Sequence, residues 1–331
     1  MRIAKGEVRT PEIGRIWFNS SPLSMRALLG KVVLIDFWDY TCVNCIRTLP
    51  YVQAWHDRYK DEGLAVVGVH TPEFTFAQYD SNVERGIREF SLTYPIVVDS
   101  SFELWKAFAN RYWPTKYLID TEGYLRYAHF GEGKYQETEE VIQELLKERD
   151  PAVQLPPTLE PVRPEDRPGA VCFKPTGELY LGHARGRIGN EGGYETDLVT
   201  IYDFNEAVLK EEFFYARGRW ASTREYFGSE GDDCRIMLKY SGAGVNLVMA
   251  ARKDSDGIVE VRRDGKPLTP EVATRDISFE NGASIIRVMK PRMYSIVDNH
   301  AFGTHTLELI IRGPGVALFA FTFTSCVSAQ P

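Results

Sequence analysis

The stretch that most constrains the fold is residues 31–50, KVVLIDFWDYTCVNCIRTLP, where two cysteines stand three apart at the end of an apolar run. The run 31–38 is continuous rather than alternating, and such runs form strands that are buried on both faces of a sheet. Apolar spacing from Cys42 to about Tyr59 predicts a helix, and LAVVGVH at 64–70 predicts a second buried strand. Strand, helix and strand in this order form a βαβ unit.

Strands and helices go on alternating along the first 150 residues. The pattern predicts a helix near 82–90, a strand at 94–99, an amphipathic helix at 100–110, a hairpin at 115–130 that turns at 121–123, and a helix at 137–147. Alternation of this kind is typical of an α/β domain, so we expect residues 1–150 to form one.

A proline-rich segment follows the predicted α/β domain. Six of the chain's 18 prolines lie between residues 151 and 168, and proline donates no backbone hydrogen bond to a helix or a sheet. We therefore expect 151–168 to be a stiff linker and a domain boundary. Residues 169–331 contain short alternating runs separated by turns with Gly and Asp, which predicts an all-β domain built as an antiparallel sandwich.

Composition and charge restrict the partners and the compartment. The formal net charge is −7 and no stripe of Lys and Arg occurs, so we expect no binding to nucleic acid. The N-terminus lacks the apolar core of a signal peptide, and no run of about 18 apolar residues is present. As written, the chain is expected to be cytoplasmic; the alternative is a periplasmic or other extracytoplasmic site, if it is part of a longer protein with an export signal.

Cysteine usage agrees with the cytoplasmic expectation. Five cysteines cannot all pair, and Cys172, Cys234 and Cys326 are scattered singly along the chain. Unpaired thiols are typical of a reducing compartment, so we expect these three to be unpaired.

The remaining two cysteines form a CxxC pair at the predicted start of a helix. Thiols at i and i+3 in a first helical turn lie close enough, with Cα atoms roughly 5–6 Å apart, for a disulfide to open and close reversibly. The helix N-terminus stabilises a thiolate, so we expect Cys42 to be the nucleophile. Cys45 lies one turn deeper and is expected to resolve the mixed disulfide, while Asp36, in the preceding strand, exchanges protons with Cys45.

The alternatives to a redox role for the CxxC pair are ordinary packing and a metal site. Such a site needs about four ligands, and no second CxxC or His pair occurs at a usable spacing. His56 is three helical turns from Cys45, roughly 16 Å by helical rise, so it cannot complete a site. We therefore expect no metal and no cofactor other than a redox-active Cys42–Cys45 disulfide.

Several offsets around the CxxC pair resemble the thioredoxin superfamily. An aspartate lies six residues before Cys42, Phe-Trp follows it, and Pro50 comes five residues after Cys45. Farther on, "WPT" resembles the cis-proline loop of that superfamily, which faces the disulfide and aligns the substrate backbone. The resemblance implies that Pro114 holds the substrate strand and that Trp38, Trp113 and Thr115 contact substrate.

Longer stretches narrow this resemblance to one branch. The insert after "LAVVGVH" is similar to the TlpA/ResA branch, in which a glutamate just past that strand assists the thiols, and Glu73 occupies the matching position. "DFWDYTCVNCIRTLPYV", "YWPTKYLID" and "FGEGKYQETE" resemble the soluble C-terminal part of DipZ-type proteins over nearly the whole chain. Those proteins carry a membrane electron-transfer domain ahead of this region, and from the sequence as written we expect none in this chain.

The same resemblance bears on the second domain. DipZ-type sandwiches are similar to carbohydrate-binding modules, which implies a jelly-roll-like sandwich and carbohydrate as a possible partner. Trp220 and Tyr226 are aromatic side chains that could stack on a sugar or anchor a partner protein. The alternative is that both rings belong to the core.

These patterns predict a thiol-disulfide oxidoreductase that reduces protein disulfides, with the sandwich recruiting substrate or ligand. The implied partners are protein disulfide substrates and an upstream electron donor, either a thioredoxin reductase-like enzyme or a membrane thiol carrier. The alternative function is a glycan-binding or protein-binding module whose first domain is a redox-sensitive scaffold. A peroxidase is not expected, because the P-x-x-x-T-x-x-C string of peroxiredoxins is absent around Cys42 and Cys45.

Overall fold

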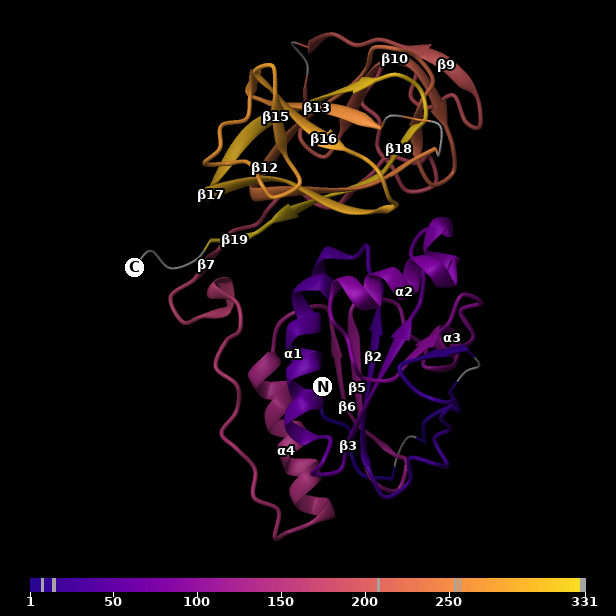
Figure 1. Ribbon diagram of the computed structural model, residues 1–331, viewed down its shortest axis with the longest axis vertical. Coiled ribbons are helices and arrows are strands. Elements are labelled where there is room, and N and C mark those ends of the chain that lie inside the picture. The colour runs from indigo at the N-terminus through magenta and orange to yellow at the C-terminus, as the bar shows by residue number, and fades with distance from the viewer. Residues whose placement is uncertain (7–8, 14–15, 207–208, 253–254, 256, 328–331) are drawn as a thin grey trace. The chain divides into compact units, whose positions relative to one another are not determined.

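The computed structural model describes residues 1–331 except 7–8, 14–15, 207–208, 253–254, 256 and 328–331. The chain forms two compact units, Met1–Asp166 and Arg167–Pro331. The division falls inside the segment predicted to be a linker (Figure 1).

The first unit is a six-stranded sheet with helices packed on it. Its strands follow the order β1-β4-β3-β2-β5-β6, in which β2, β3 and β4 are parallel and the other neighbours are antiparallel. This is the predicted α/β arrangement, and its elements are β1 (Ile16–Phe18), β2 (Val32–Trp38), α1 (Val43–Tyr59), β3 (Leu64–His70), α2 (Asp80–Glu89), β4 (Ile96–Val98), α3 (Glu103–Ala107), β5 (Thr115–Ile119), β6 (Leu125–Phe130) and α4 (Tyr135–Arg149).

Side chains of β2 alternate between two separate cores. Val32, Leu34 and Trp38 pack with α1, α2 and α4 on one face, whereas Ile35 and Phe37 pack with α3 on the other. Every residue of β2 is buried, as expected for a central parallel strand with covered faces. Figure 1 shows α1 and α4 side by side along the sheet. Asp36 therefore points into the face that α1 covers.

The helix predicted at 100–110 is shorter than expected. Helix α3 contains only Glu103–Ala107, because left-handed backbone at Phe102 and Ala109 interrupts the helix on both sides. The other predicted helices of this unit are present with bounds within two residues of those expected.

Residues 151–166 pack against the first unit and do not hang free as a linker. The Gln143 side chain donates to the Pro156 carbonyl at 2.8 Å, and the Leu159 backbone N–H donates to Glu139 at 2.8 Å. Tyr51 on α1 accepts from the Val162 N–H at 2.9 Å. Because these bonds attach the segment to α1 and α4, the first unit includes the proline-rich stretch as an extended strap.

The second unit is built from strands, and its described part contains no α-helix. Eleven of its strands form one antiparallel sheet, in the order β15-β16-β13-β17-β12-β10-β11-β18-β8 with β14 on β13 and β9 on β10. They are β8 (Leu179–Tyr180), β9 (Val199–Tyr202), β10 (Phe214–Ser222), β11 (Phe227–Ser229), β12 (Cys234–Ala251), β13 (Ile258–Arg263), β14 (Lys266–Pro267), β15 (Ser278–Glu280), β16 (Ala283–Arg287), β17 (Arg292–Arg312) and β18 (Val316–Thr324).

Two long strands, β12 and β17, let this sheet enclose one core. Their pairing shifts register between Gly242 and Gly244 and again between Val245 and Asn246, and such bulges bend a strand. Strand β18 pairs with both β11 and β12, so the sheet returns on itself around a single apolar cluster. The prediction that this region is all-β and antiparallel is therefore confirmed.

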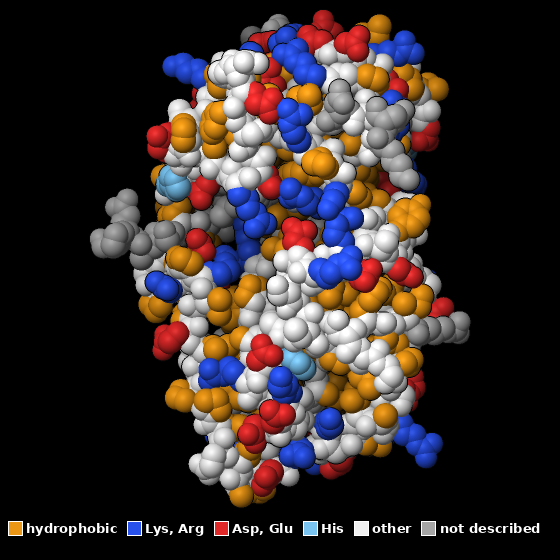
Figure 2. Space-filling view, viewed as in Figure 1, with side chains coloured by type: hydrophobic (Ala, Val, Ile, Leu, Met, Phe, Trp, Pro, Cys, Tyr) orange, Lys and Arg blue, Asp and Glu red, His pale blue; other side chains and the backbone are white. Residues whose placement is uncertain are grey.

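Charge is mixed over the first unit. On the face shown in Figure 2, acidic and basic side chains alternate over that unit without a large area of one sign. In the first unit, ion pairs join different elements, including Arg126 with Glu148 at 2.7 Å and Arg2 with Glu144 at 2.5 Å.

Candidate active site

The two CxxC cysteines lie where β2 ends and α1 begins. Cys42 is the N-cap residue of α1, and its Sγ accepts a hydrogen bond from the Cys45 backbone N–H at 3.4 Å. The first N–H groups of a helix have no partner within the helix, so they are free to donate to a group at this position. Cys42 is half-buried and Cys45 is fully buried, and both carry free thiols. Burial, and then the neighbouring Cys42, raise the pKa of the Cys45 thiol.

Asp36 lies under this pair in a dry environment. Its carboxylate is fully buried and accepts no hydrogen bond from any described residue. Burial raises the pKa of Asp36 to about 7, while the charge of Lys116 acts in the opposite direction. A carboxyl group with a pKa near neutrality can both take and return a proton under physiological conditions.

Lys116 is a site residue that sequence reasoning missed. It stands directly opposite Asp36 on β5, so both side chains point to the same face of the sheet. Lys116 is fully buried, its Nζ has no hydrogen-bond partner among the described residues, and burial lowers its pKa. The available signal was the single cation in the apolar strand "TKYLID", which becomes informative only once the register of β5 on β2 is known.

Gly68 is the β3 residue opposite Asp36, and its lack of a side chain leaves room for the rings of Tyr94 and Trp38. A Cβ at this position would lie 2.9 Å from the Tyr94 ring and 3.1 Å from Nε1 of Trp38. Burial, then the charges of Asp36 and Cys45, raise the pKa of Tyr94. The space beneath Cys45 is thus enclosed by rings that exclude water and leave Asp36 poorly solvated.

Asp39 fixes the loop that carries Cys42. Its buried carboxylate accepts from the Thr41 N–H at 2.6 Å, from the Thr41 hydroxyl at 2.7 Å and from the Glu73 N–H at 2.6 Å. Burial raises the pKa of Asp39, and these hydrogen bonds oppose that shift. Asp39 therefore ties the segment after β3 to the CxxC loop. Glu73 itself is half-buried at this junction.

The "WPT" stretch directly precedes β5. The Trp113–Pro114 peptide bond is cis, and Thr115 pairs with Phe37 near the end of β2. This pairing places Pro114 at the end of the sheet where β2 stops and the CxxC loop begins. Trp113 is half-buried, donates from Nε1 to the Thr71 carbonyl at 3.0 Å, and packs on the same core as Cys42.

Two residues expected to contact substrate are buried. Trp38 is fully buried between β2 and its neighbours, and Thr115 is fully buried with its hydroxyl donating to the Tyr112 carbonyl at 2.8 Å. Neither side chain has a face that a protein substrate could touch. Both support the site, whereas Trp113 is only half-buried.

In the second unit, Trp220 belongs to the core. Its side chain is fully buried, its Nε1 donates to the Arg217 carbonyl at 2.9 Å, and its ring stacks on Phe227 at 5.0 Å. A sugar-stacking role for Trp220 is therefore wrong, because stacking needs an exposed ring face. Tyr226 is half-buried, with its ring 5.3 Å from that of Phe319.

Two of the cysteines expected to be unpaired are joined. Cys172 and Cys326 form a disulfide between β7 (Val171–Cys172) and β19 (Cys326–Val327), 154 residues apart in sequence. The sequence offered no sign of this pairing, because the two strands meet only through the fold. Cys234 is free and buried, as expected for an unpaired thiol.

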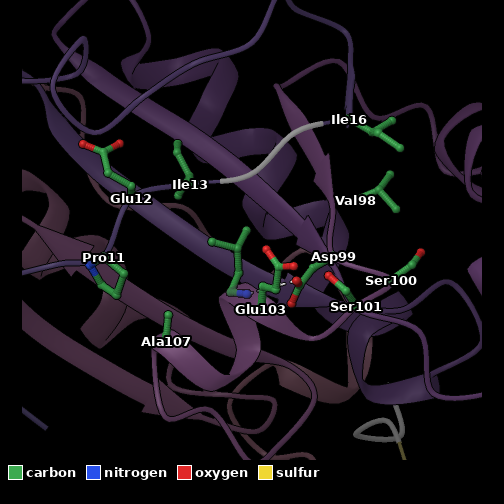
Figure 3. A pocket seen from close by; sticks show the side chains of 11 residues that line it. Pro11, Glu12, Ile13, Ile16, Val98, Asp99, Ser100, Ser101, Glu103 and Ala107 are labelled. Atoms are coloured by element: carbon green, nitrogen blue, oxygen red, sulfur yellow. Dashed lines mark hydrogen bonds between the residues drawn. The ribbon is translucent and has the colours of Figure 1, made fainter.

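A separate cavity of about 720 Å³ lies at the β1–β4 edge (Figure 3). Its polar wall includes Asp99, but that carboxylate already accepts from the Leu104 and Trp105 N–H groups at the start of α3. None of the predicted site residues lines this cavity.

Within the described ranges, no three His, Cys, Asp or Glu side chains are grouped so that they could hold a metal ion. No helix in the same ranges is long and apolar enough to cross a membrane.

Comparison with known proteins gives matches for both units. The AhpC/TSA family matches residues 18–128, and the family described as thioredoxin like C-terminal domain matches residues 176–324. Protein DipZ of Mycobacterium tuberculosis is 35% identical over 310 residues, which are 93% of this chain and 41% of DipZ. The chain thus spans less than half the length of that relative.

Shorter proteins match the first unit. The thiol-disulfide oxidoreductase YkuV of Bacillus subtilis is 31% identical over 136 residues, which are 41% of this chain and 91% of YkuV. Among solved structures, a thiol-disulfide isomerase from Corynebacterium glutamicum is 23% identical with a TM-score of 0.40, and the match covers 43% of this chain and 98% of that one.

Proposed function

Because the chain belongs to the thioredoxin-like thiol-disulfide oxidoreductases, we propose that it reduces protein disulfides through the Cys42–Cys45 dithiol. The observation that carries this proposal is the half-buried Cys42 sulfur on the α1 N-terminus, bonded to the backbone of a fully buried Cys45. One thiol is open to a substrate and the other is shielded, which is the asymmetry that the two steps of the reaction need.

In the first step, the Cys42 thiolate attacks one sulfur of a substrate disulfide. A Cys42–substrate disulfide forms, and the other substrate sulfur leaves as a thiolate that takes up a proton. In the second step, Cys45 gives its proton to Asp36 and attacks Cys42 Sγ. The Cys42–Cys45 disulfide forms, the second substrate sulfur leaves as a thiolate that takes up a proton, and two electrons have passed to the substrate.

Asp36 suits this second step because of where it lies and how it titrates. Burial makes Cys45 a weak acid, so a thiolate forms there only if a nearby base takes the proton. With a pKa of about 7, Asp36 is partly ionised at neutral pH. We propose that Pro114 holds the substrate strand, that Trp113 contacts it, and that Glu73, positioned by Asp39, assists at the mouth of the site.

The test compares the intact chain with two variants. Reduced wild-type protein should reduce insulin, and Cys45→Ser should accumulate mixed disulfides through Cys42 in a cell extract. Cys42→Ser is the matched control, because it keeps one thiol but removes the accessible one. If wild type fails to reduce insulin and Cys45→Ser traps no partner, the binding-protein alternative is favoured. The equilibrium constant of the pair with glutathione decides whether the chain acts as a reductant or an oxidant.

For the second unit, we propose a role in holding substrate or ligand. A jelly-roll-like, carbohydrate-binding sandwich is one form of this proposal, but Trp220 no longer supports it. Tyr226 is the remaining aromatic candidate, and the edge strand β9 exposes Val199 and Ile201, which favours contact with a protein. Binding of the whole chain to a glycan array, compared with Tyr226→Ala, tests the carbohydrate form. A lack of binding by both proteins would refute it.

We also propose that the chain works outside the cytoplasm, contrary to the simplest expectation from its sequence. The support is the Cys172–Cys326 disulfide, because disulfides persist in oxidising compartments and are rare in reducing ones. A membrane thiol carrier is then the more suitable electron donor than a reductase of the thioredoxin reductase type. Cell fractionation tests this, and a chain recovered only from the cytoplasm with reduced Cys172 would refute it.

A further inference from the structure

The Cys172–Cys326 disulfide lies outside the core of its unit. Both residues of β7, Val171 and Cys172, are exposed, and Cys326 is half-buried. Neither cysteine belongs to the apolar cluster that fills the second unit, whereas Cys234 does. Cys172 is therefore the more exposed half of the disulfide, and we infer that a thiolate reaches it from solvent, which is the first requirement for exchange.

Opening the disulfide would free little structure. Strands β7 and β19 form their own two-stranded sheet, and neither belongs to the eleven-stranded sheet. Their ladder is extended by one hydrogen bond, from the Phe173 N–H to the Ser325 carbonyl at 3.0 Å. Because these strands take no part in the ladders of the large sheet, we expect the unit to stay folded after the S–S bond breaks.

From this placement we propose that Cys172–Cys326 is a second thiol-disulfide exchange site, which a vicinal dithiol opens while the second unit stays folded. The natural donor class is a reduced CxxC dithiol, such as that of a second copy of this chain. Only the choice of donor rests on the proposed function; the reactivity of the disulfide does not.

The two sulfurs differ in a way that sets the direction of attack. The donor thiolate bonds to the exposed Cys172 Sγ, the Cys172–Cys326 bond breaks, and Cys326 leaves as a thiolate that then takes up a proton. The Ser325 hydroxyl lies 3.4 Å from Cys326 Sγ and can donate a hydrogen bond to the leaving sulfur. The second donor thiol then displaces Cys172. The donor becomes a disulfide, and two electrons reduce Cys172 and Cys326.

The main experiment uses the full chain with Cys42→Ser and Cys45→Ser, which leaves Cys172–Cys326 as its disulfide. The variant is treated with dithiothreitol at several urea concentrations below its unfolding transition, then alkylated, and each cysteine peptide is quantified. We expect the opening rate to change less than twofold over this range. Alkylation of the buried Cys234, a built-in reporter of unfolding, should stay below one tenth of that of Cys172.

A purely structural disulfide, which opens only when the unit unfolds, would behave differently. Opening would then accelerate with urea in parallel with Cys234 alkylation, and this result would overturn the proposal. The dithiothreitol arm does not involve the CxxC pair, so it decides the question even if the proposed reductase activity fails.

A second arm tests the donor. A reduced Cys172→Ser/Cys326→Ser variant is mixed with the oxidised Cys42→Ser/Cys45→Ser variant, and insulin reduction by the donor is measured in parallel. We expect electrons to pass to Cys172 and Cys326, and a donor that also carries Cys45→Ser to be trapped on Cys172 rather than Cys326. A donor that reduces insulin but leaves Cys172–Cys326 closed would overturn the assignment of a CxxC donor.

Discussion

Replacing Lys116 by methionine isolates the charge that opposes the burial of Asp36. Methionine nearly matches the length and volume of the lysine side chain but carries no charge, so the change leaves the packing on β5 nearly intact. Lys116 and Asp36 occupy directly paired positions on β5 and β2 and are both fully buried. Removing the cation should therefore raise the pKa of Asp36 beyond its value of about 7.

The size of the effect follows from Coulomb's law. Side chains on directly paired strand positions have Cβ atoms about 5 Å apart, so we take the two charges to be about 6 Å apart. At an effective dielectric constant of about 20, this separation gives an interaction of about 3 kcal/mol, or about a hundredfold in an equilibrium. The ionised fraction of Asp36 at pH 7 should fall by tens-fold in Lys116→Met, and the Cys45 attack should slow by a similar factor.

The assay separates the two chemical steps. A mixed disulfide between Cys42 and a fluorescent thiol is formed at low pH, and its release by Cys45 is followed by stopped flow from pH 5 to 10. We expect the midpoint of the wild-type profile near pH 7 to move upward by one to two units in Lys116→Met. Lys106→Met, an exposed lysine on α3, is the matched control and should leave the profile unchanged.

A double variant distinguishes an electrostatic effect of Lys116 from an effect on packing. In an Asp36→Asn background the carboxyl group is absent, so adding Lys116→Met should not shift the midpoint further. If Lys116→Met slows release equally at every pH, or shifts the profile in the Asp36→Asn background as well, then the lysine acts through packing and the electrostatic reasoning is refuted.

Three further results are expected. Asp36 has a pKa of about 7 in the folded protein, above the ordinary value of 3.8, so it contributes stability below pH 4 that is lost as pH rises through 7. Relative to wild type, Asp36→Asn should therefore gain about 4 kcal/mol in the free energy of urea unfolding between pH 4 and pH 8, and a constant difference would contradict this. Asp39→Ala leaves the N–H groups of Thr41 and Glu73 without acceptors and should cost about 2–4 kcal/mol, measured by the same unfolding experiment. Trp220→Ala should cost about 3–5 kcal/mol without weakening any glycan binding that the chain shows, whereas a loss of binding with unchanged stability would restore the ligand role.

The parts of the site that lie close together in sequence could be predicted from it. One strand and the following helix turn supply Asp36, Cys42 and Cys45, and their roles follow from the spacing of an apolar run and a CxxC pair. The α/β fold of the first unit was predictable for a related reason, since buried parallel strands are continuous apolar runs of recognisable length.

The parts that depend on strand register could not be predicted. Lys116 meets Asp36 only because β5 pairs with β2 at those two positions, and Gly68 meets it only through β3. Burial of Trp38 and Thr115 has the same origin: both lie on strands that are covered on each face, which a match to a short motif does not reveal. A motif indicates which residues belong to a site, whereas the sheet decides which of them can touch a substrate.

The Cys172–Cys326 disulfide shows the limit of counting cysteines. Each cysteine is isolated in sequence, yet the two lie in β7 and β19, the first and last strands of the second unit, and those strands pair with each other. Closing a loop of 154 residues constrains the unfolded chain strongly, so the bond favours the folded unit even though neither cysteine belongs to its apolar core. A bond at such a position can stabilise the unit when oxidised and yet be opened by a thiol from solvent, because stability depends on the loop that it closes and reactivity on the exposure of its sulfurs.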